Sequence, residues 1–238
     1  MNKVIIVGAS SGIGKELAHL YADTDAKIGL IGRREEKLKE LSLTNPQKYV
    51  YRTCDVSDTG LTAVCMSELV DALGGLDLVI ISAGTGELNN DLDYSLEANT
   101  IFTNVLGWTH LMDWTYLYFQ RQGHGHLVNI SSVGGLRGDG IAPAYNASKS
   151  YQINYTEGIR KKAAKRRLSL FITDVRPGFV DTSMAKGDGL FWVASVEKAS
   201  KQIFRAIQQR RKIVYVTKRW RLIAGILKLI PTSIYHKI

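Results

Sequence analysis

The sequence predicts a single α/β domain built on a doubly wound parallel sheet of about seven strands, with helices on both faces of the sheet. Three observations lead to this prediction. Short runs rich in Val and Ile alternate with segments of helical periodicity along the whole chain of 238 residues. These runs are apolar over their full length, as are strands buried on both faces. A helical segment follows nearly every run and provides the crossover that two parallel strands require.

The expected elements alternate regularly. We expect strands at 3–8, 27–32, 49–56, 76–84, 125–132, 169–178 and 212–216. The helical patterns cover 12–23, 34–43, 62–74, a long stretch across roughly 93–121, 145–165 and 195–209. This order is that of a Rossmann-like sheet, in which ligands bind at the carboxyl ends of the strands. Residues that carry chemistry are therefore expected at these strand ends.

Composition and the N-terminus narrow the class of protein. The chain is 45% hydrophobic and has only 4 prolines, which excludes a disordered or low-complexity protein. Cys54 and Cys65 form neither a metal-binding pattern nor a disulfide framework, so we predict no metal. The N-terminus runs directly into an apolar strand without the features of a leader peptide, and we expect a cytoplasmic protein.

A glycine-rich turn follows the first expected strand. In IIVGASSGIG, Gly8, Gly12 and Gly14 stand between the strand and the following helix. Glycine permits a tight turn there and lets a pyrophosphate approach backbone N–H groups at the positive end of the helix. The spacing G-x3-G-x-G differs from the more familiar G-x-G-x-x-G. The turn predicts dinucleotide binding.

The end of the second expected strand indicates which dinucleotide. Enzymes that select NAD carry a carboxylate there to bind the ribose 2′-hydroxyl. This chain has Gly32 in that place, followed by Arg33 and Arg34. Because a guanidinium matches a phosphate with two hydrogen bonds, these arginines favour the 2′-phosphate of NADP(H). The alternative is two solvated arginines at a helix start, where the helix dipole disfavours cations.

The stretch AYNASKSY holds a phenol and an ammonium four residues apart. Tyr145 and Lys149 would lie on one face of a helix. A free phenol has a pKa of about 10 and is a poor acid or base near neutral pH. A cation close by favours the phenolate, and we therefore expect Lys149 to lower the pKa of Tyr145. The pair predicts a tuned proton donor.

These motifs together resemble the short-chain dehydrogenase/reductase family over about residues 3–183. GASSGIG is the glycine motif of that family, and Asp55 in CDVSD matches its acidic residue near the adenine. SAG, residues 82–84, stands where the family has N-A-G. NVLG aligns Asn104 with the catalytic Asn, and Ser132 precedes Tyr145 at the spacing of the family's catalytic Ser.

The resemblance implies four catalytic residues and their roles. Tyr145 would protonate a carbonyl oxygen as NADPH delivers hydride to the carbon, or act as base in the reverse direction. Lys149 would lower the pKa of that tyrosine and hold the ribose hydroxyls of the nicotinamide. Ser132 would donate a hydrogen bond to the substrate oxygen. Asn104 would position a water that links Lys149 to solvent for proton resupply.

The resemblance, the glycine turn and the two arginines after the second strand together imply NADP(H) as cofactor. The expected contacts are Gly8, Ser10, Ser11, Gly12, Ile13, Gly14, Arg33, Arg34, Asp55, Val56, Ser82, Ala83, Gly84, Tyr145, Lys149, Pro177, Gly178, Val180 and Thr182. We therefore predict an NADPH-dependent oxidoreductase acting on a lipophilic carbonyl or secondary alcohol. A 3-oxoacyl thioester reductase and a non-catalytic NADP-binding redox sensor are the alternatives.

Variable segments are expected to shape the substrate site. They are 85–95, 133–143 and 183–195. The last contains Phe191, Trp192 and Val193 close to two glycines, which suits a mobile apolar lid. Ordinary packing in the core explains these aromatic residues equally well.

The C-terminal segment 217–238 is expected to form a separate tail after a catalytic domain of residues 1–216. Residues 201–238 contain ten Lys or Arg and no Asp or Glu. Trp220, Ile223, Leu227 and Ile230 fall on one stripe of a helix. A basic amphipathic helix of this kind fits the inner face of an anionic membrane, or it packs on the core or on another subunit.

Two further expectations concern partners. The basic segment 160–167 ends the helix that starts near Tyr145, where cations complement the helix dipole. It brings no nucleic-acid recognition motif, so we predict no nucleic-acid partner. The resemblance implies that the helices around Asn104 and Tyr145 pair between subunits, which predicts a homodimer or homotetramer.

Overall fold

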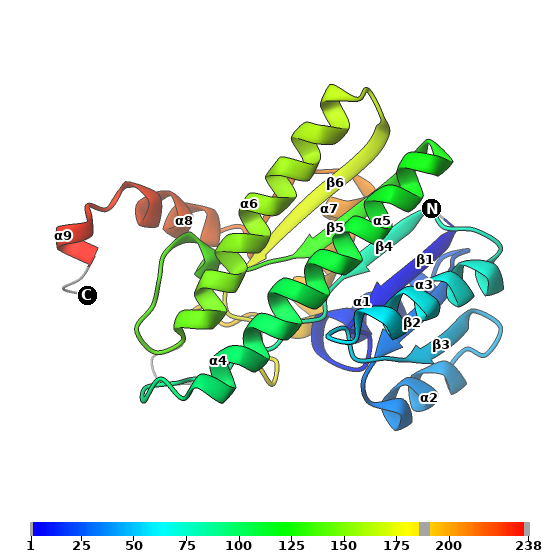
Figure 1. Ribbon diagram of the computed structural model, residues 1–238, viewed down its shortest axis with the longest axis horizontal. Helices are drawn as coiled ribbons and strands as arrows, with labels where there is room; N and C mark the ends of the chain where they lie inside the picture. Colours follow the sequence, from blue (N-terminus) through cyan, green and yellow to red (C-terminus); the bar gives the residue numbers. More distant parts are fainter. Residues whose placement is uncertain (1, 186–190, 236–238) are drawn as a thin grey trace.

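The computed structural model describes residues 2–185 and 191–235, and Figure 1 shows their course. Within these ranges, seven parallel strands form one sheet in the order β3-β2-β1-β4-β5-β6-β7. Their bounds are β1 (Lys3–Val7), β2 (Lys27–Gly32), β3 (Tyr49–Thr53), β4 (Leu78–Ile81), β5 (His124–Ile130), β6 (Ser169–Pro177) and β7 (Ile213–Val216). The predicted doubly wound sheet is confirmed.

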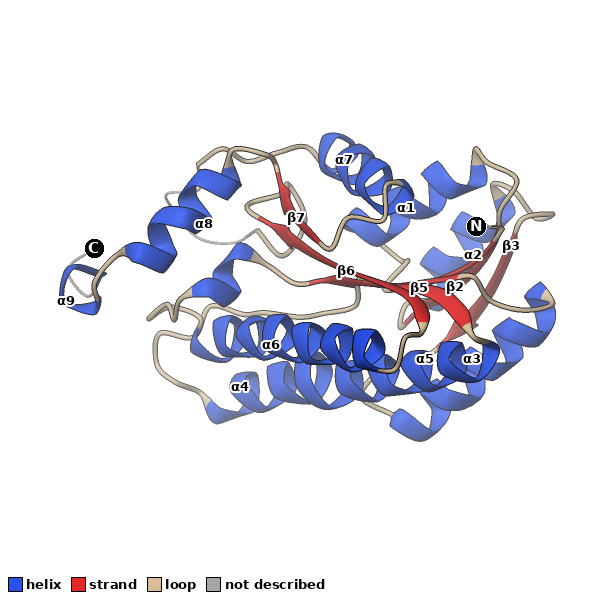
Figure 2. Cartoon of the chain, turned by 90° about the horizontal axis from the view of Figure 1, so that it is seen from above, coloured by secondary structure: helices blue, strands red, loops and turns tan. Residues whose placement is uncertain are grey.

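Helices cover both faces of the sheet, as Figure 2 shows. They are α1 (Gly12–Ala22), α2 (Glu35–Leu43), α3 (Thr59–Leu73), α4 (Tyr94–Ile101), α5 (Trp108–Gln122), α6 (Pro143–Lys165), α7 (Val196–Gln208), α8 (Trp220–Leu229) and α9 (Thr232–Tyr235). α1, α2 and α7 pack on one face, and α3, α5 and α6 pack on the other. Because the strands are parallel, the loops that follow them all leave the sheet at the same edge.

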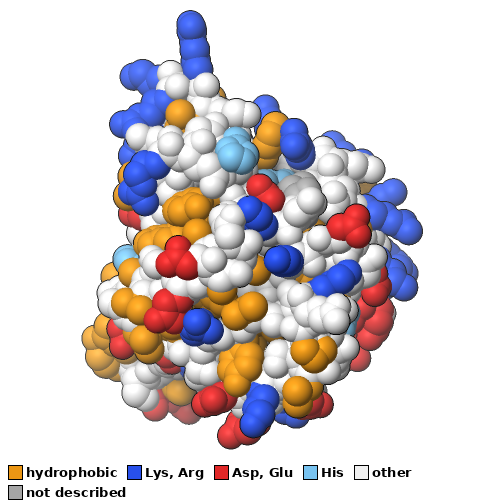
Figure 3. Space-filling view, turned by 90° about the vertical axis from the view of Figure 1, so that its right-hand side faces the viewer, with side chains coloured by type: hydrophobic (Ala, Val, Ile, Leu, Met, Phe, Trp, Pro, Cys, Tyr) orange, Lys and Arg blue, Asp and Glu red, His pale blue; other side chains and the backbone are white. Residues whose placement is uncertain are grey.

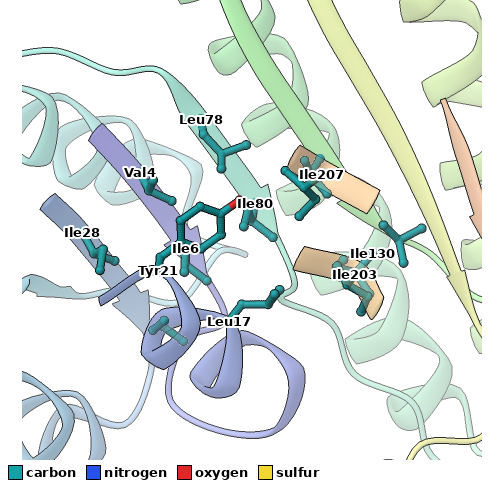
Figure 4. Packing of buried hydrophobic residues seen from close by; sticks show 14 of the residues in the cluster. Val4, Ile6, Leu17, Tyr21, Ile28, Leu78, Ile80, Ile130, Ile203 and Ile207 are labelled. Carbon is teal, nitrogen blue, oxygen red and sulfur yellow. The ribbon is translucent and has the colours of Figure 1, made fainter. Parts of the chain in front are cut away.

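Two hydrophobic clusters, one on each face, hold the layers together. Along β1, Val4 and Ile6 point to one cluster and Ile5 and Val7 to the other, because successive side chains of a strand alternate between faces. Figure 4 shows the first cluster, in which side chains of β1 and β4 meet Leu17 and others from α1 and α7. A strand buried on both faces has no polar alternation, which explains the continuous apolar runs of the sequence.

The long helix expected across 93–121 is interrupted. α4 and α5 are separated by the π-helical turn Phe102–Gly107, which contains Asn104. The wide turn changes the direction in which its residues face, and such turns occur often at functional positions. Helical periodicity at the sequence level does not distinguish a wide turn from a regular one.

Charged side chains are unevenly distributed over the surface. The basic segment 160–167 ends α6, and most of its Lys and Arg side chains are exposed. Figure 3 shows Lys and Arg gathered at the upper end of one face, while acidic and basic groups are mixed over the rest of it. Among the helices of the described ranges, none is both long enough and apolar enough to cross a bilayer.

Candidate active site

A cleft lies at the carboxyl ends of the central strands. It has a volume of about 770 Å³ and is lined by the glycine turn after β1, by the start of α6 and by the apolar side of α8. Of the residues predicted from the sequence, the following line it: Gly8, Ser10, Ser11, Gly12, Ile13, Arg33, Arg34, Val56, Ser82, Ala83, Gly84, Ser132, Tyr145, Lys149, Pro177, Gly178, Val180 and Thr182. Gly14, Asp55 and Asn104, which the sequence also predicted, are not among the residues that line the cleft.

The glycine turn is shaped by close backbone approaches. Gly8 has a φ of +89°, and a Cβ on it would lie 2.5 Å from the backbone nitrogen of Ala83. A Cβ on Gly14 would lie 2.2 Å from the carbonyl oxygen of Gly8. The backbone therefore forms a bare cradle at the N-terminus of α1, where a pyrophosphate would meet backbone N–H groups and the positive end of the helix dipole. This cradle fits a dinucleotide.

The two arginines after β2 have different partners. Arg34 donates hydrogen bonds to the Ser10 hydroxyl from Nη2 at 2.8 Å and from Nε at 3.2 Å, and to the Ser11 hydroxyl at 2.6 Å. Arg33 forms a salt bridge of 3.5 Å with Asp55. Arg34 is thus held against the glycine turn, whereas the charge of Arg33 is offset by Asp55.

Asp55 is held in its ionised form. Partial burial raises the pKa of its carboxyl, but hydrogen bonds from the backbone and hydroxyl of Ser57, together with Arg33, outweigh burial and leave the pKa below its usual range. The charge of Asp55 therefore persists at neutral pH and anchors Arg33, which lines the cleft.

Tyr145 and Ser132 meet across the cleft. Ser132 caps the short 3-10 turn Val133–Leu136, where its hydroxyl accepts a hydrogen bond of 3.0 Å from the Gly134 N–H. A Cβ added to Gly134 would lie 3.4 Å from the Ser132 Oγ and 3.7 Å from Cε1 of Tyr145, so the two side chains are neighbours, and hydrogen bonding from Ser132 favours the phenolate. Two hydroxyl groups therefore converge on the place where the oxygen of a carbonyl would lie.

The expected direction of the Tyr145 pKa shift is wrong for this structure. Burial raises the pKa of the Tyr145 phenol above its ordinary value, and the hydrogen bond with Ser132 lowers it by less. The Lys149 ammonium lies 5.8 Å from the centre of the Tyr145 ring and does not reverse this balance. Desolvation of the phenolate exceeds the attraction of the cation, so Tyr145 keeps its proton at neutral pH.

Lys149 is deeply buried and firmly held. Its Nζ donates to the carbonyl oxygen of Ile130 at 3.2 Å and to Oε1 of Gln152 at 3.1 Å. Burial lowers the pKa of Lys149 to about 8, against the opposing attraction of Asp174. The ammonium is therefore charged at neutral pH and titrates within the range in which enzymes operate.

Asn104 clamps the loop after β4. Its Oδ1 accepts from the Thr85 N–H at 2.9 Å, and its Nδ2 donates to the Thr85 carbonyl at 2.7 Å and to the Ser148 hydroxyl at 3.0 Å. The clamp brings the backbone of Gly84 beside Lys149, so that a Cβ on Gly84 would lie 3.4 Å from Nζ. Asn104 thus holds in place the backbone of residues 84 and 85, which lines the cleft.

Sequence reasoning missed Gly86 and Gln152. A Cβ on Gly86 would lie 2.5 Å from Cδ2 of Tyr145, so the tyrosine ring packs directly on this glycine. Gln152 bonds both Lys149 and the Asn104 carbonyl. Only the second position had a signal in the sequence, since residues three apart share a helix face and Gln152 follows Lys149 by three.

The side of the cleft formed by α8 is aromatic. Trp220 of α8 stacks on Phe191, with ring centres 5.1 Å apart. It also meets Phe179 edge to face, with ring centres 5.3 Å apart. Gly178 allows this arrangement, since a Cβ there would lie 2.0 Å from the Trp220 ring. Of the expected lid 183–195, residues 186–190 lie outside the described residues. In the described part, Phe191 and Trp192 pack on Trp220.

The C-terminal stripe forms the predicted helix but faces the protein. Trp220 is buried, and Ile223 and Leu227 line the cleft. α8 therefore supplies one wall of the cleft, as the interpretation of a helix packed on the core predicts. Tyr235 of α9 continues this wall, where its hydroxyl donates to the Gly138 carbonyl at 2.7 Å and its ring lies under Arg137.

A bare phosphate cradle beside two hydroxyls and a buried lysine defines an oxidoreductase that uses a nicotinamide nucleotide. The short chain dehydrogenase family model matches residues 2–189. An uncharacterized oxidoreductase of Staphylococcus epidermidis is 32% identical over 187 residues, which are 77% of this chain and 80% of that one. One of Mycobacterium tuberculosis is 34% identical over 190 residues, which are 76% and 74% of the two chains. The chain belongs to the short-chain dehydrogenase/reductase family.

Solved structures share the fold. A short chain dehydrogenase/reductase from Burkholderia phymatum in complex with NAD has a TM-score of 0.85 at 19% identity, over 94% of this chain and 92% of that one. A short chain dehydrogenase from Burkholderia cenocepacia in complex with NADP also has a TM-score of 0.85, at 20% identity, over 99% and 96% of the two chains. One of these proteins holds NAD and the other NADP, so the fold alone does not select between the two.

Proposed function

We propose that the protein is an NADPH-dependent reductase that converts the carbonyl group of a lipophilic substrate to a secondary alcohol, and catalyses the reverse reaction when the oxidised cofactor is bound. The observation that carries the proposal is the meeting of Ser132, Tyr145 and Lys149 at the sheet edge that also bears the glycine cradle. A non-catalytic redox sensor would need only the cradle, so the complete catalytic half favours an enzyme.

The chain's own residues account for the proton chemistry. When bound, NADPH supplies the hydride. Ser132 donates a hydrogen bond to the substrate oxygen, and Tyr145 gives its proton to the same oxygen as negative charge develops there. The raised pKa of Tyr145 keeps that proton available at neutral pH. Lys149, charged below about pH 8, stabilises the phenolate that remains.

The preference for NADPH rests on Arg34. Its guanidinium is fixed by Ser10 and Ser11 at the point where a 2′-phosphate would approach, and Gly32 leaves no carboxylate there to repel it. Arg34→Ala is expected to raise the Kd for NADPH about tenfold through loss of a charge-assisted hydrogen bond, and to leave the Kd for NADH within about twofold. Fluorescence titration of both nucleotides measures this. Equal weakening of both would show that Arg34 supports the turn rather than the phosphate.

The substrate class follows from the walls of the cleft. Phe179, Phe191, Trp220, Ile223 and Leu227 present an apolar surface beside the catalytic hydroxyls. We expect ketones, aldehydes, quinones and steroids to be better substrates than small polar carbonyls. Monitoring NADPH oxidation at 340 nm against such a set, with 3-oxoacyl thioesters included, tests the proposal and separates the two reductase alternatives. Absence of turnover with every carbonyl class would reject it.

We propose that the protein assembles as a homodimer or homotetramer through the face formed by α4, α5 and α6. Ile101, Phe102 and Leu106 are 43%, 54% and 52% exposed on this face. Exposed apolar side chains gathered on one surface mark an interface. Leu106→Glu is expected to halve the mass measured by light scattering, whereas Leu43→Glu, at an exposed position of α2, leaves it unchanged. A wild-type protein of monomer mass would contradict the assembly.

We also propose contact between α8 and an anionic membrane surface, through the helix face opposite the cleft. Leu222, Ile226 and Leu229 are 70%, 53% and 84% exposed and form a ridge at helical spacing. Arg219, Arg221 and Lys228 flank the ridge, and each is exposed. An apolar ridge between cations matches a lipid surface whose headgroups are negative.

The membrane contact is tested with point variants, because removing residues 217–238 would also remove a wall of the cleft. Vesicles containing phosphatidylglycerol are expected to sediment with the wild-type protein and to lose about nine-tenths of it when Leu222 and Leu229 are both replaced by Ser. Leu43→Ser is the control for an exposed leucine on another helix. Equal sedimentation with neutral vesicles, or none with either kind, would contradict an electrostatic contact.

A further inference from the structure

Gln152 is a buried polar side chain between two groups of the active site. It is fully excluded from solvent on α6, one turn after Lys149. Its Oε1 accepts a hydrogen bond of 3.1 Å from Nζ of Lys149, and its Nε2 donates one of 2.9 Å to the backbone carbonyl of Asn104. Both ends of the amide are therefore satisfied, each by a group that the proposed reaction depends on.

A buried amide is costly unless it is hydrogen-bonded, so the two bonds of Gln152 indicate a role for its polar atoms. An unbonded amide in an apolar interior costs several kcal/mol, and an apolar side chain of the same length would fill the space without that risk. The orientation of the amide is fixed by its partners, since an ammonium only donates and a carbonyl only accepts. Gln152 therefore presents an acceptor to Lys149 and a donor to Asn104, and the reverse orientation would leave both contacts repulsive.

We propose that Gln152 is a positioning residue for the reaction: its side-chain amide joins the Lys149 ammonium to the Asn104 carbonyl and keeps that ammonium charged. The inference rests on the proposed function, because it concerns the lysine of the same catalytic set. An amide does not pass protons on readily at neutral pH, so this bridge positions the ammonium and is not itself a route for protons.

The charge on Lys149 depends on a small number of neighbours. Asp174 of β6 favours the ammonium, although its own charge is shared with Arg176 through a salt bridge of 2.6 Å. Tyr145, one turn earlier on α6, is neutral while its pKa is raised. β5 contributes the uncharged carbonyl of Ile130. Desolvation lowers the pKa of Lys149 to about 8, against the attraction of Asp174. The Gln152 oxygen accepts a hydrogen bond from the ammonium, and a hydrogen bond to the charged form favours that form.

The test measures the Lys149 titration directly, in protein without cofactor. Lysine 13Cε NMR, with the Lys149 signal assigned by its absence in Lys149→Met, is expected to show a midpoint near pH 8 in the wild-type protein. Gln152→Met keeps the length of the side chain and removes the acceptor, so the midpoint falls by about one pH unit. Gln152→Glu restores an acceptor and is expected to return the midpoint to the wild-type value or above it.

Thr156→Val is the matched control. Thr156 is equally buried, lies one turn further along α6 and bonds Asn129 instead of Lys149. This variant is expected to lower the melting temperature without moving the midpoint. A wild-type midpoint in Gln152→Met, or an equal shift in Thr156→Val, would overturn the proposal.

Activity provides a second reading that separates this inference from the proposed function. With a ketone substrate found by the screen, the alkaline limb of kcat/KM is expected to move down by about one pH unit in Gln152→Met, while the KM for NADPH changes less than kcat. If the wild-type protein reduces no carbonyl compound, the proposed function fails while the NMR result still decides the role of Gln152. If turnover is present and neither the midpoint nor the limb moves, Gln152 has only a packing role.

Discussion

Replacing Tyr145 by Phe is expected to lower kcat for carbonyl reduction by about a thousandfold, because the substrate oxygen loses its proton donor. Phe retains the ring that packs on Gly86 and removes only the hydroxyl bonded to Ser132. NADPH binding is expected to stay within about threefold, since the cradle at Gly8 and the arginine at position 34 are unaffected. A steady-state assay of carbonyl reduction measures kcat, and fluorescence titration measures the Kd for NADPH.

Tyr155→Phe provides the control for this prediction. Tyr155 lies on the same helix, but its hydroxyl donates to Asp113 at 2.6 Å, and the side chain packs away from the cleft. Its loss should change stability and leave kcat close to the wild-type value. A Tyr145→Phe enzyme that keeps more than a few per cent of the activity would remove Tyr145 from the role of general acid.

The sequence predicted those features that depend on local periodicity. Apolar runs such as 3–8 and 27–32 identify strands buried on both faces, and the structure has β1 and β2 at these positions. Tyr145 and Lys149 are brought to one helix face by spacing alone. The glycine turn has a fixed position after the first strand, so its place at the sheet edge follows from the topology.

Features that depend on contacts between distant segments could not be predicted from the sequence. Gly86 is one glycine among several, and only the fold brings the Tyr145 ring onto it. Trp220 lies more than forty residues from Gly178, yet its ring rests on that glycine. The stripe on 217–238 identified an amphipathic helix correctly, but hydrophobic periodicity does not say whether a helix face meets protein or lipid.

The sign of the Tyr145 pKa shift shows a second limit. A cation one helical turn away is visible in the sequence, and its effect on a phenol in water is known. The depth at which the phenol is buried is a property of the assembled cleft, and this depth raises the pKa of Tyr145 more than its partners lower it. A phenol that holds its proton suits the direction of carbonyl reduction.

Gly86→Ala is expected to lower kcat about a hundredfold with little change in the Kd for NADPH. The added Cβ would lie 2.5 Å from Cδ2 and 3.0 Å from Cγ of Tyr145, a separation that forces the ring or the loop to move. The Asn104 clamp at Thr85 resists movement of the loop, so the tyrosine is the part that shifts. A displacement of about 1 Å at a reacting group is enough for an effect of this size.

The matched control is Gly140→Ala, where an added Cβ would meet nothing within 4 Å. Kinetics of this variant should equal those of the wild-type enzyme. Adding Gly86→Ala to Tyr145→Phe should then cause almost no further loss, because the glycine acts on turnover through the tyrosine hydroxyl that is already absent. Full additivity of the two losses would mean that Gly86 serves the cleft by another route, such as the approach of the substrate itself.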